Sequence, residues 1–139
     1  MYYVSTKASF DSAHFLAGHS GKCSNLHGHR WDVEVTLFSE SVHESGSERG
    51  MVCDFSDVKE ALRHMADGFD HTFIYEKGTL PDGLIEMMKE QGFVLTEVDF
   101  RPTAENFAKH FYDRIKAGGF DVASVTVWET PDNAATYEE

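Results

Sequence analysis

The sequence has little of several features that would place it in a specialised class of protein. Its 139 residues include only two cysteines and three prolines, and 12 basic residues stand against 24 acidic ones. Two cysteines do not make a disulfide framework, and no segment approaches the ~20 apolar residues of a membrane span. The net charge of -12 argues against nucleic acid as a partner, because phosphate backbones are bound by excess Lys and Arg.

The composition is that of a folded domain. Hydrophobic residues make up 41% of the chain and aromatic residues 13%, which is enough for a core. There is no internal repeat or low-complexity linker, so we expect a single domain over residues 1–139. Residues 1–7 lack the basic head and apolar run of a signal peptide, which predicts a cytoplasmic protein.

Hydrophobic periodicity predicts an α+β fold. Apolar alternation indicates strands over residues 2–12, 29–38 and 122–130, and a short strand ending near Tyr137. Two helices are predicted, one at 55–66 after the N-cap Asp54 and one after the N-cap Thr103, ending at 118–119. Residues 75–101 are less regular, with a short helix near 84–90 and an extended stretch at 93–98. The order ββααββ predicts two helices beside an antiparallel sheet.

The strongest motif is Cys-Ser-Asn-Leu-His-Gly-His at residues 23–29. His27 and His29 would project from one face of a strand, because side chains there repeat every two residues. His14 follows the first strand and can reach the same face if the two strands pair. Three imidazoles suit Zn²⁺ and leave a coordination position open for substrate. Ordinary surface histidines are the alternative, and the combination with Cys23 argues against it.

Other polar residues are ambiguous from sequence alone. Cys23 is a fourth zinc ligand, a catalytic thiol or an inert packed residue, whereas Cys53 lies in an apolar segment typical of a buried structural cysteine. Glu129 continues the apolar face of its strand, so it is either a buried carboxylate that needs a partner or an exposed strand end. Asp70-His71 after the first helix is a weak pattern by itself. The remaining histidines are interpreted as solvated: His19, His43, His64 and His110.

Taken together, these motifs resemble the 6-pyruvoyl-tetrahydropterin synthase / 6-carboxy-tetrahydropterin synthase family. The resemblance rests on His14, Cys23-x-x-x-His27-Gly-His29, residues 51–55 (Met-Val-Cys-Asp-Phe), Asp70-His71, residues 102–106 (Pro-Thr-Ala-Glu-Asn) and residues 128–130 (Trp-Glu-Thr). These motifs occur in order over nearly the whole chain. The three-residue gap between Cys23 and His27 is similar to the bacterial carboxy-forming branch of queuosine biosynthesis. Residues 76–99 are longer than in compact members, and Arg30 replaces a small residue.

The resemblance implies a T-fold with a four-stranded antiparallel sheet and two helices on one side. It implies a homo-oligomer, usually a hexamer built as a dimer of trimers, with active sites between subunits. The implied substrate is 7,8-dihydroneopterin triphosphate. The implied products are 6-carboxy-5,6,7,8-tetrahydropterin, acetaldehyde and triphosphate, formed with Zn²⁺ as Lewis acid.

The resemblance also implies roles for individual residues. Cys23 would be the base, and Asp70 and His71 from a neighbouring subunit would complete a proton relay. Glu129 would anchor the pterin through paired hydrogen bonds, assisted by Thr103 and Glu105. Lys22 and Arg30 are our candidates for triphosphate binding, because the chain has few basic residues.

Three rival functions remain open at this stage. One is a synthase of the same family that forms the pyruvoyl product. Another is a non-catalytic zinc module in which Cys23 closes a four-ligand site. The third is a zinc hydrolase that uses metal-bound water.

Overall fold

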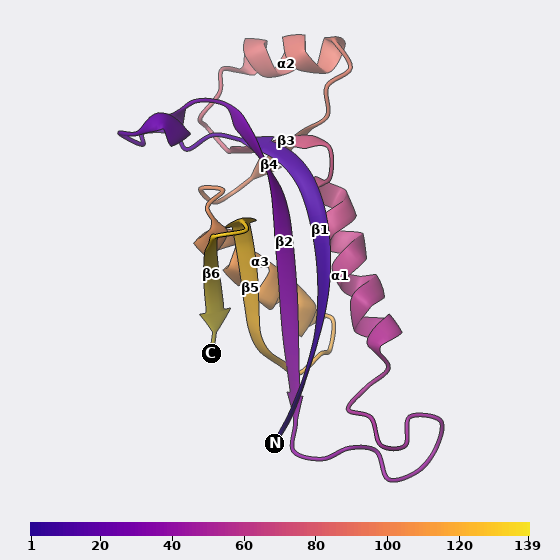
Figure 1. Cartoon of the computed structure of the whole chain (residues 1–139). Coiled ribbons are helices and arrows are strands. Elements are labelled where there is room, and N and C mark those ends of the chain that lie inside the picture. Colours follow the sequence, from indigo (N-terminus) through magenta and orange to yellow (C-terminus); the bar gives the residue numbers. More distant parts are fainter.

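A long antiparallel hairpin forms the centre of the protein, which is described from a computed structural model that covers all 139 residues. β1 (Tyr2–His14) pairs along its whole length with β2 (His27–Ser39), from Tyr2 opposite Ser39 to His14 opposite His27. Figure 1 shows the two strands running side by side through the molecule. Both strands are longer than predicted. As a result, His14 and His27 lie within the sheet, directly opposite each other.

The sheet has six strands in the order β4-β3-β1-β2-β5-β6. β5 (Val122–Thr130) and β6 (Asn133–Glu138) extend it antiparallel beyond β2, as the sequence predicted. On the other side, β3 (Thr72–Glu76) runs parallel to β1, and β4 (Leu95–Val98) runs parallel to β3. The predicted four-stranded, purely antiparallel sheet is therefore wrong in strand count and direction. The five-residue β3 is too short for alternation to reveal it, whereas β4 lies in the extended stretch that was predicted at 93–98.

Two helices cover one face of the sheet, as predicted. α1 (Phe55–Phe69) packs on β1, and α3 (Ala104–Ala117) packs on β5 and β6. The predicted N-caps are confirmed, because the Asp54 and Thr103 side chains accept hydrogen bonds from the first turns of these helices. The core between helices and sheet is rich in aromatic residues, including Phe10, Trp31, Phe69, Phe107 and Phe111.

A third helix lies outside this layer. α2 (Asp82–Glu90) has no buried residue, and it stands beyond β3 and β4 at one end of the sheet (Figure 1). The sequence predicted a short helix near this position, at residues 84–90. No helix of the protein is long and apolar enough to cross a membrane.

The opposite face of the hairpin carries a ladder of polar cross-strand pairs. Lys7 faces Glu34 with 3.6 Å between Nζ and Oε2, and Asp11 faces Arg30 at 3.1 Å. The core face of the same strands carries Phe10 and Trp31, which are fully buried. This alternation assigns every odd-numbered residue of β1 to the outer face and every even-numbered residue to the helix-covered face.

Candidate metal centre

Four side chains converge where β1, β2 and β5 end on the helix-covered face. His14 ends β1, His27 and His29 begin β2, and Glu129 lies near the end of β5. One ligand atom from each lies within 4.8 Å of every other in the group. The strand register brings them together, because His14 is paired with His27 and Ser12 with His29. The structure thus assembles the three histidines that the sequence singled out.

Backbone carbonyls fix the orientation of two imidazoles. Nδ1–H of His14 donates to the carbonyl of Pro102 at 2.8 Å, and Nδ1–H of His27 donates to the carbonyl of Asn25 at 2.6 Å. Each ring then presents an unprotonated Nε2, the form that binds metals. The two Nε2 atoms lie 3.1 Å apart. Tetrahedral Zn–N bonds of roughly 2.0–2.1 Å place two ligand nitrogens about 3.3 Å apart, so this spacing suits a shared cation.

The third imidazole has an incomplete set of partners. His29 Nε2 lies 2.8 Å from Glu129 Oε1, close enough for an ion pair. The contact does not have hydrogen-bond geometry, however, and His29 Nε2 is a buried polar atom without a hydrogen bond. Buried polar nitrogens are rarely left unpaired. A cation held between the imidazoles and the carboxylate would satisfy it, which is the second observation that fits a metal.

The surroundings of His14 and His29 favour the neutral form of these two imidazoles. Burial, together with the neighbouring His27 and His29 rings, lowers the pKa of His14 from 6.5 to about 4, although its bond to Pro102 opposes this. Burial likewise lowers the pKa of His29, and the Glu129 carboxylate opposes that shift. The Trp31 ring lies beneath both, with ring centroids 5.0 Å from His14 and 5.5 Å from His29. A neutral imidazole in an apolar setting is suited to bind a cation.

Cys23 lies near this group without belonging to it. It sits in the short 3₁₀ turn η1 (Lys22–Ser24), half-buried and with a free thiol. The four-residue group that could hold a metal does not include it. The carbonyl of Cys23 accepts the amide of Leu16 at 2.9 Å, which closes the loop between β1 and β2. Cys23 is therefore not among the side chains that this structure brings together as possible metal ligands.

Asp70 and His71 form a dyad at the corner between α1 and β3. His71 Nδ1 lies 2.8 Å from Asp70 Oδ2, and the other carboxylate oxygen accepts the amide of Asp11 at 2.8 Å. These two hydrogen bonds hold the pKa of the Asp70 carboxyl below its usual value, and the bond from the Asp11 backbone N–H has the larger effect. His71 has φ of 57°, the one non-glycine residue with positive φ. This left-handed conformation is uncommon outside glycine. Here it is held by a hydrogen bond of 2.7 Å from the backbone N–H of His71 to the carbonyl of Asp11.

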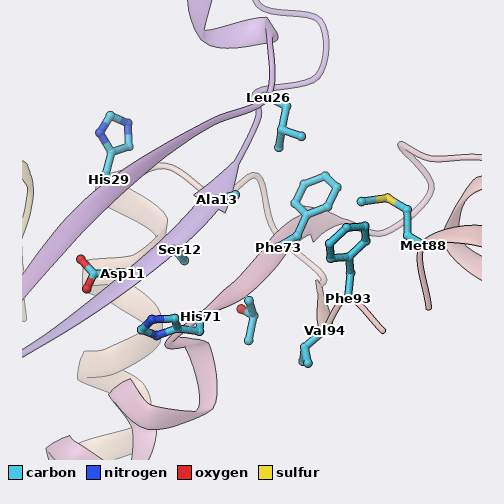
Figure 2. Close-up of a pocket in the computed structure, with 11 residues that line it drawn as sticks. Asp11, Ser12, Ala13, Leu26, His29, His71, Phe73, Met88, Phe93 and Val94 are labelled. Atoms are coloured by element: carbon cyan, nitrogen blue, oxygen red, sulfur yellow. The ribbon is translucent and has the colours of Figure 1, made fainter. Parts of the chain in front are cut away.

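The dyad and the metal group lie on opposite faces of the sheet within one chain. His71 lines a cavity of about 630 Å³ together with Ala13, Phe73 and Phe93, and His29 lies at the border of the same cavity. In Figure 2 the imidazole of His29 points away from the apolar side chains of this cavity. The His71 side chain is 80% exposed. Within one chain, therefore, the exposed His71 imidazole is not part of the histidine group.

The other predicted site residues are spread over both faces. Thr103 and Glu105 are at the start of α3, next to Pro102, whose carbonyl orients His14. Lys22 is exposed in the η1 turn. Arg30 lies on the outer face, paired with Asp11 beside the dyad, and not with the metal group. The structure thus places Thr103 next to the residue that orients His14, Glu105 in the exposed first turn of α3, and Arg30 on the other side of the sheet.

The chain is similar to known proteins over nearly its whole length. The sequence profile of the 6-pyruvoyl tetrahydropterin synthase family matches residues 3–139. The chain belongs to this family. It is 37% identical over the full length of both chains to the 6-carboxy-5,6,7,8-tetrahydropterin synthase of Haemophilus influenzae. It is 38% identical to the enzyme of the same name from Aquifex aeolicus, over 85% of this chain and 76% of the relative.

Solved structures of the family share the fold. The Caenorhabditis elegans 6-pyruvoyl tetrahydropterin synthase aligns over 99% of this chain and 95% of its own, with a TM-score of 0.69 and 25% identity. The protein therefore has the T-fold of its family, with six strands in place of the expected four.

Some residues at this family member's site were not found from the sequence. Asn25 and Pro102 act through backbone carbonyls, which carry no side-chain pattern. Arg101 was overlooked because it stands alone between apolar and turn residues, yet its side chain reaches Ala17, 84 positions away.

His110 was interpreted as solvated, which is wrong. It is half-buried, packed against Phe100 with 5.1 Å between ring centroids, and burial lowers its pKa.

Proposed function

We propose that this protein is a zinc-dependent 6-carboxy-5,6,7,8-tetrahydropterin synthase of queuosine (7-deazapurine) biosynthesis. It would convert 7,8-dihydroneopterin triphosphate to 6-carboxy-5,6,7,8-tetrahydropterin, acetaldehyde and triphosphate. The observation that carries the proposal is the convergence of the imidazoles of His14, His27 and His29 at the end of the sheet where β1 ends and β2 begins. The full-length similarity to synthases of that name supports the choice of reaction.

The three imidazoles would hold the metal, with Glu129 as their acidic neighbour. Zn²⁺ bound there would act as a Lewis acid on the side-chain oxygens of the substrate. The Pro102 and Asn25 carbonyls orient two of the ligands, and such outer partners raise metal affinity and fix the tautomer. Burial of His14 beneath the site would limit the entry of water.

Cys23 would remove the proton from the side-chain carbon next to the pterin ring. Its position outside the metal group leaves the thiol free for this role. The Asp70–His71 dyad has the form of an oriented acid–base pair, because the carboxylate accepts Nδ1–H and leaves Nε2 for proton transfer. The left-handed backbone at His71 holds the imidazole out from the sheet.

A shared site between copies of the chain would unite these parts. The His71 side chain is largely exposed and is not part of the histidine group, so it would serve the metal site of another copy. The family resemblance supports a hexamer, a dimer of trimers. Exposed apolar residues such as Phe93 and Val94 beside His71 and the open edges of β4 and β6 are surfaces that assembly would cover.

The substrate would be held by residues around the histidines. Glu129, supported by Thr103 and Glu105, would accept the N–H groups of the pterin. A carboxylate accepts two such bonds at once, and charge-assisted bonds of this kind are strong. Lys22 lies in the same loop as Cys23 and would meet the triphosphate. Arg30, beside the dyad, would contact the triphosphate bound at a neighbouring copy.

Incubation of the zinc-loaded protein with 7,8-dihydroneopterin triphosphate tests this function. Mass spectrometry should find 6-carboxy-5,6,7,8-tetrahydropterin together with acetaldehyde. The pyruvoyl compound as main product would assign the chain to the other branch of the family. Phosphate release from many nucleotides without pterin conversion would indicate a zinc hydrolase. A zinc-loaded protein that converts none of these substrates would support a structural zinc module.

A further inference from the structure

The loop that carries Cys23 is held mainly by bonds within itself. It connects β1 to β2, and its amides and carbonyls pair internally, Leu16 with Cys23, His19 with Leu16, and Asn25 with Lys22. Asn25 is bound in turn by His27 of β2. Only one hydrogen bond ties this loop to a residue outside the β1–β2 hairpin, from Arg101 Nη2 to the carbonyl of Ala17 at 3.1 Å.

Arg101 is itself fixed at the entrance to α3. Its carbonyl accepts the Asn106 side-chain amide at 2.9 Å and the amide of Thr103 at 2.8 Å. The next residue is Pro102, whose carbonyl orients His14 at 2.8 Å. One rigid segment therefore contacts both the metal group, through Pro102, and the loop of Cys23, through Arg101.

We propose that Arg101 is a positioning residue that sets the place of the Cys23 loop relative to the metal-binding histidines. The guanidinium is suited to this task, because its planar donors hold a carbonyl in a fixed direction. The inference rests on the proposed function for the importance of Cys23. The effect of the Arg101–Ala17 hydrogen bond on the loop can be measured without any activity.

A different role for Arg101 would be direct binding of the anionic part of the substrate. Arg101 Nε is buried and has no hydrogen-bond partner, so the guanidinium retains an unused donor. The two roles predict different kinetics. A positioning role affects the geometry of proton removal, and therefore kcat, because misplacement of a catalytic group by about 1 Å can cost ~10²-fold in rate. Loss of an anion contact made equally in ground and transition states raises KM.

Arg101→Met keeps the aliphatic stem and removes every donor, and Arg101→Lys restores one donor. Hydrogen–deuterium exchange of residues 16–25 should accelerate about fivefold in Arg101→Met, the factor expected for one lost hydrogen bond. Arg101→Lys should recover part of the protection. Arg63→Met, an exposed arginine of α1, is the matched control and should leave exchange unchanged. Zinc content should be the same in all three variants.

Kinetics with the pterin triphosphate add a second readout. We expect Arg101→Met to lower kcat at least about tenfold with KM within about twofold of the wild type. Unchanged exchange of residues 16–25 in Arg101→Met would contradict the positioning role of Arg101. A higher KM with unchanged kcat would contradict it as well. If the wild-type protein converts no pterin, the proposed function fails. The exchange experiment still decides whether Arg101 positions the Cys23 loop.

Discussion

The Nε2 atoms of His14 and His27 face each other at 3.1 Å, while the Nδ1–H of each ring is donated to a backbone carbonyl. Two lone pairs directed at each other repel unless a cation lies between them. The pair is therefore suited to hold a cation, and its geometry follows from the pairing of residue 14 with residue 27.

Removal of one imidazole should empty the site. We expect about one zinc per wild-type chain by elemental analysis, and loss of most of it in His29→Ala, because two imidazoles make a poor zinc site. His43→Ala, an exposed histidine paired with Glu48, is the control and should keep its zinc. Full zinc occupancy in His29→Ala would show that the three-histidine assignment is wrong.

Substitution of Cys23 should separate chemistry from metal binding. Cys23→Ala should keep its zinc, its fold and its affinity for the pterin, because the thiol is outside the metal group. Its turnover should fall by roughly 10²–10⁴-fold, the contribution of a general base. Zinc analysis, thermal unfolding and single-turnover kinetics on one preparation test this. A zinc-free variant would instead support a structural site that Cys23 closes, and a fully active variant would remove its role.

The two carboxylates near the site can be compared directly. Glu129→Gln places a donor where the pterin also has donors, so we expect substrate affinity to fall by about 1–3 kcal/mol, with zinc retained by the three histidines. Glu105→Gln is the matched variant on the first turn of α3 and should have a smaller effect. Calorimetric titration of both variants decides between them. Zinc loss in Glu129→Gln would make Glu129 a metal ligand, and a larger effect of Glu105→Gln would transfer the anchor to Glu105.

The opposite placement of His71 and the histidine group predicts complementation between inactive variants. His71→Ala and Cys23→Ala should each be inactive alone. Unfolding and refolding them together should restore roughly one quarter of wild-type activity, because each shared site draws its two halves from different copies. Mixing without refolding serves as the control. Failure to regain activity in verified mixed oligomers would place both residues in one chain's site.

His110 should make stability depend on pH. Burial against Phe69 and Phe100 lowers its pKa, and Arg114 adds to this, whereas Asp99 and Asp113 oppose it. The unfolded chain then binds the proton more readily than the folded protein, so stability is full above the ordinary pKa of about 6.5 and falls below it. His110→Phe should reduce the loss of stability between about pH 7 and pH 5, measured by urea unfolding. An equal loss in both proteins would contradict this prediction.

Much of the arrangement was contained in local sequence pattern. Alternation located the hairpin and the C-terminal strands, and capping residues Asp54 and Thr103 located the starts of α1 and α3. The spacing of His27 and His29 placed both on one face of a strand, since that depends only on the two-residue repeat. The grouping of the three histidines and the helix-covered sheet were therefore predictable from the sequence.

Tertiary structure alone decided the remaining features. β3 is too short to show a period, and it forms because β1 offers it a parallel edge for backbone pairing; the parallel pairing of β4 with β3 was likewise decided by the fold. The face on which His71 lies depends on the reversal at residues 70–71, which no side-chain pattern indicates. The supports of the site are a backbone carbonyl at Pro102 and a bond from Arg101 to Ala17. Such long-range contacts arise only when the chain is folded, because they join residues whose neighbours in sequence give no information about each other.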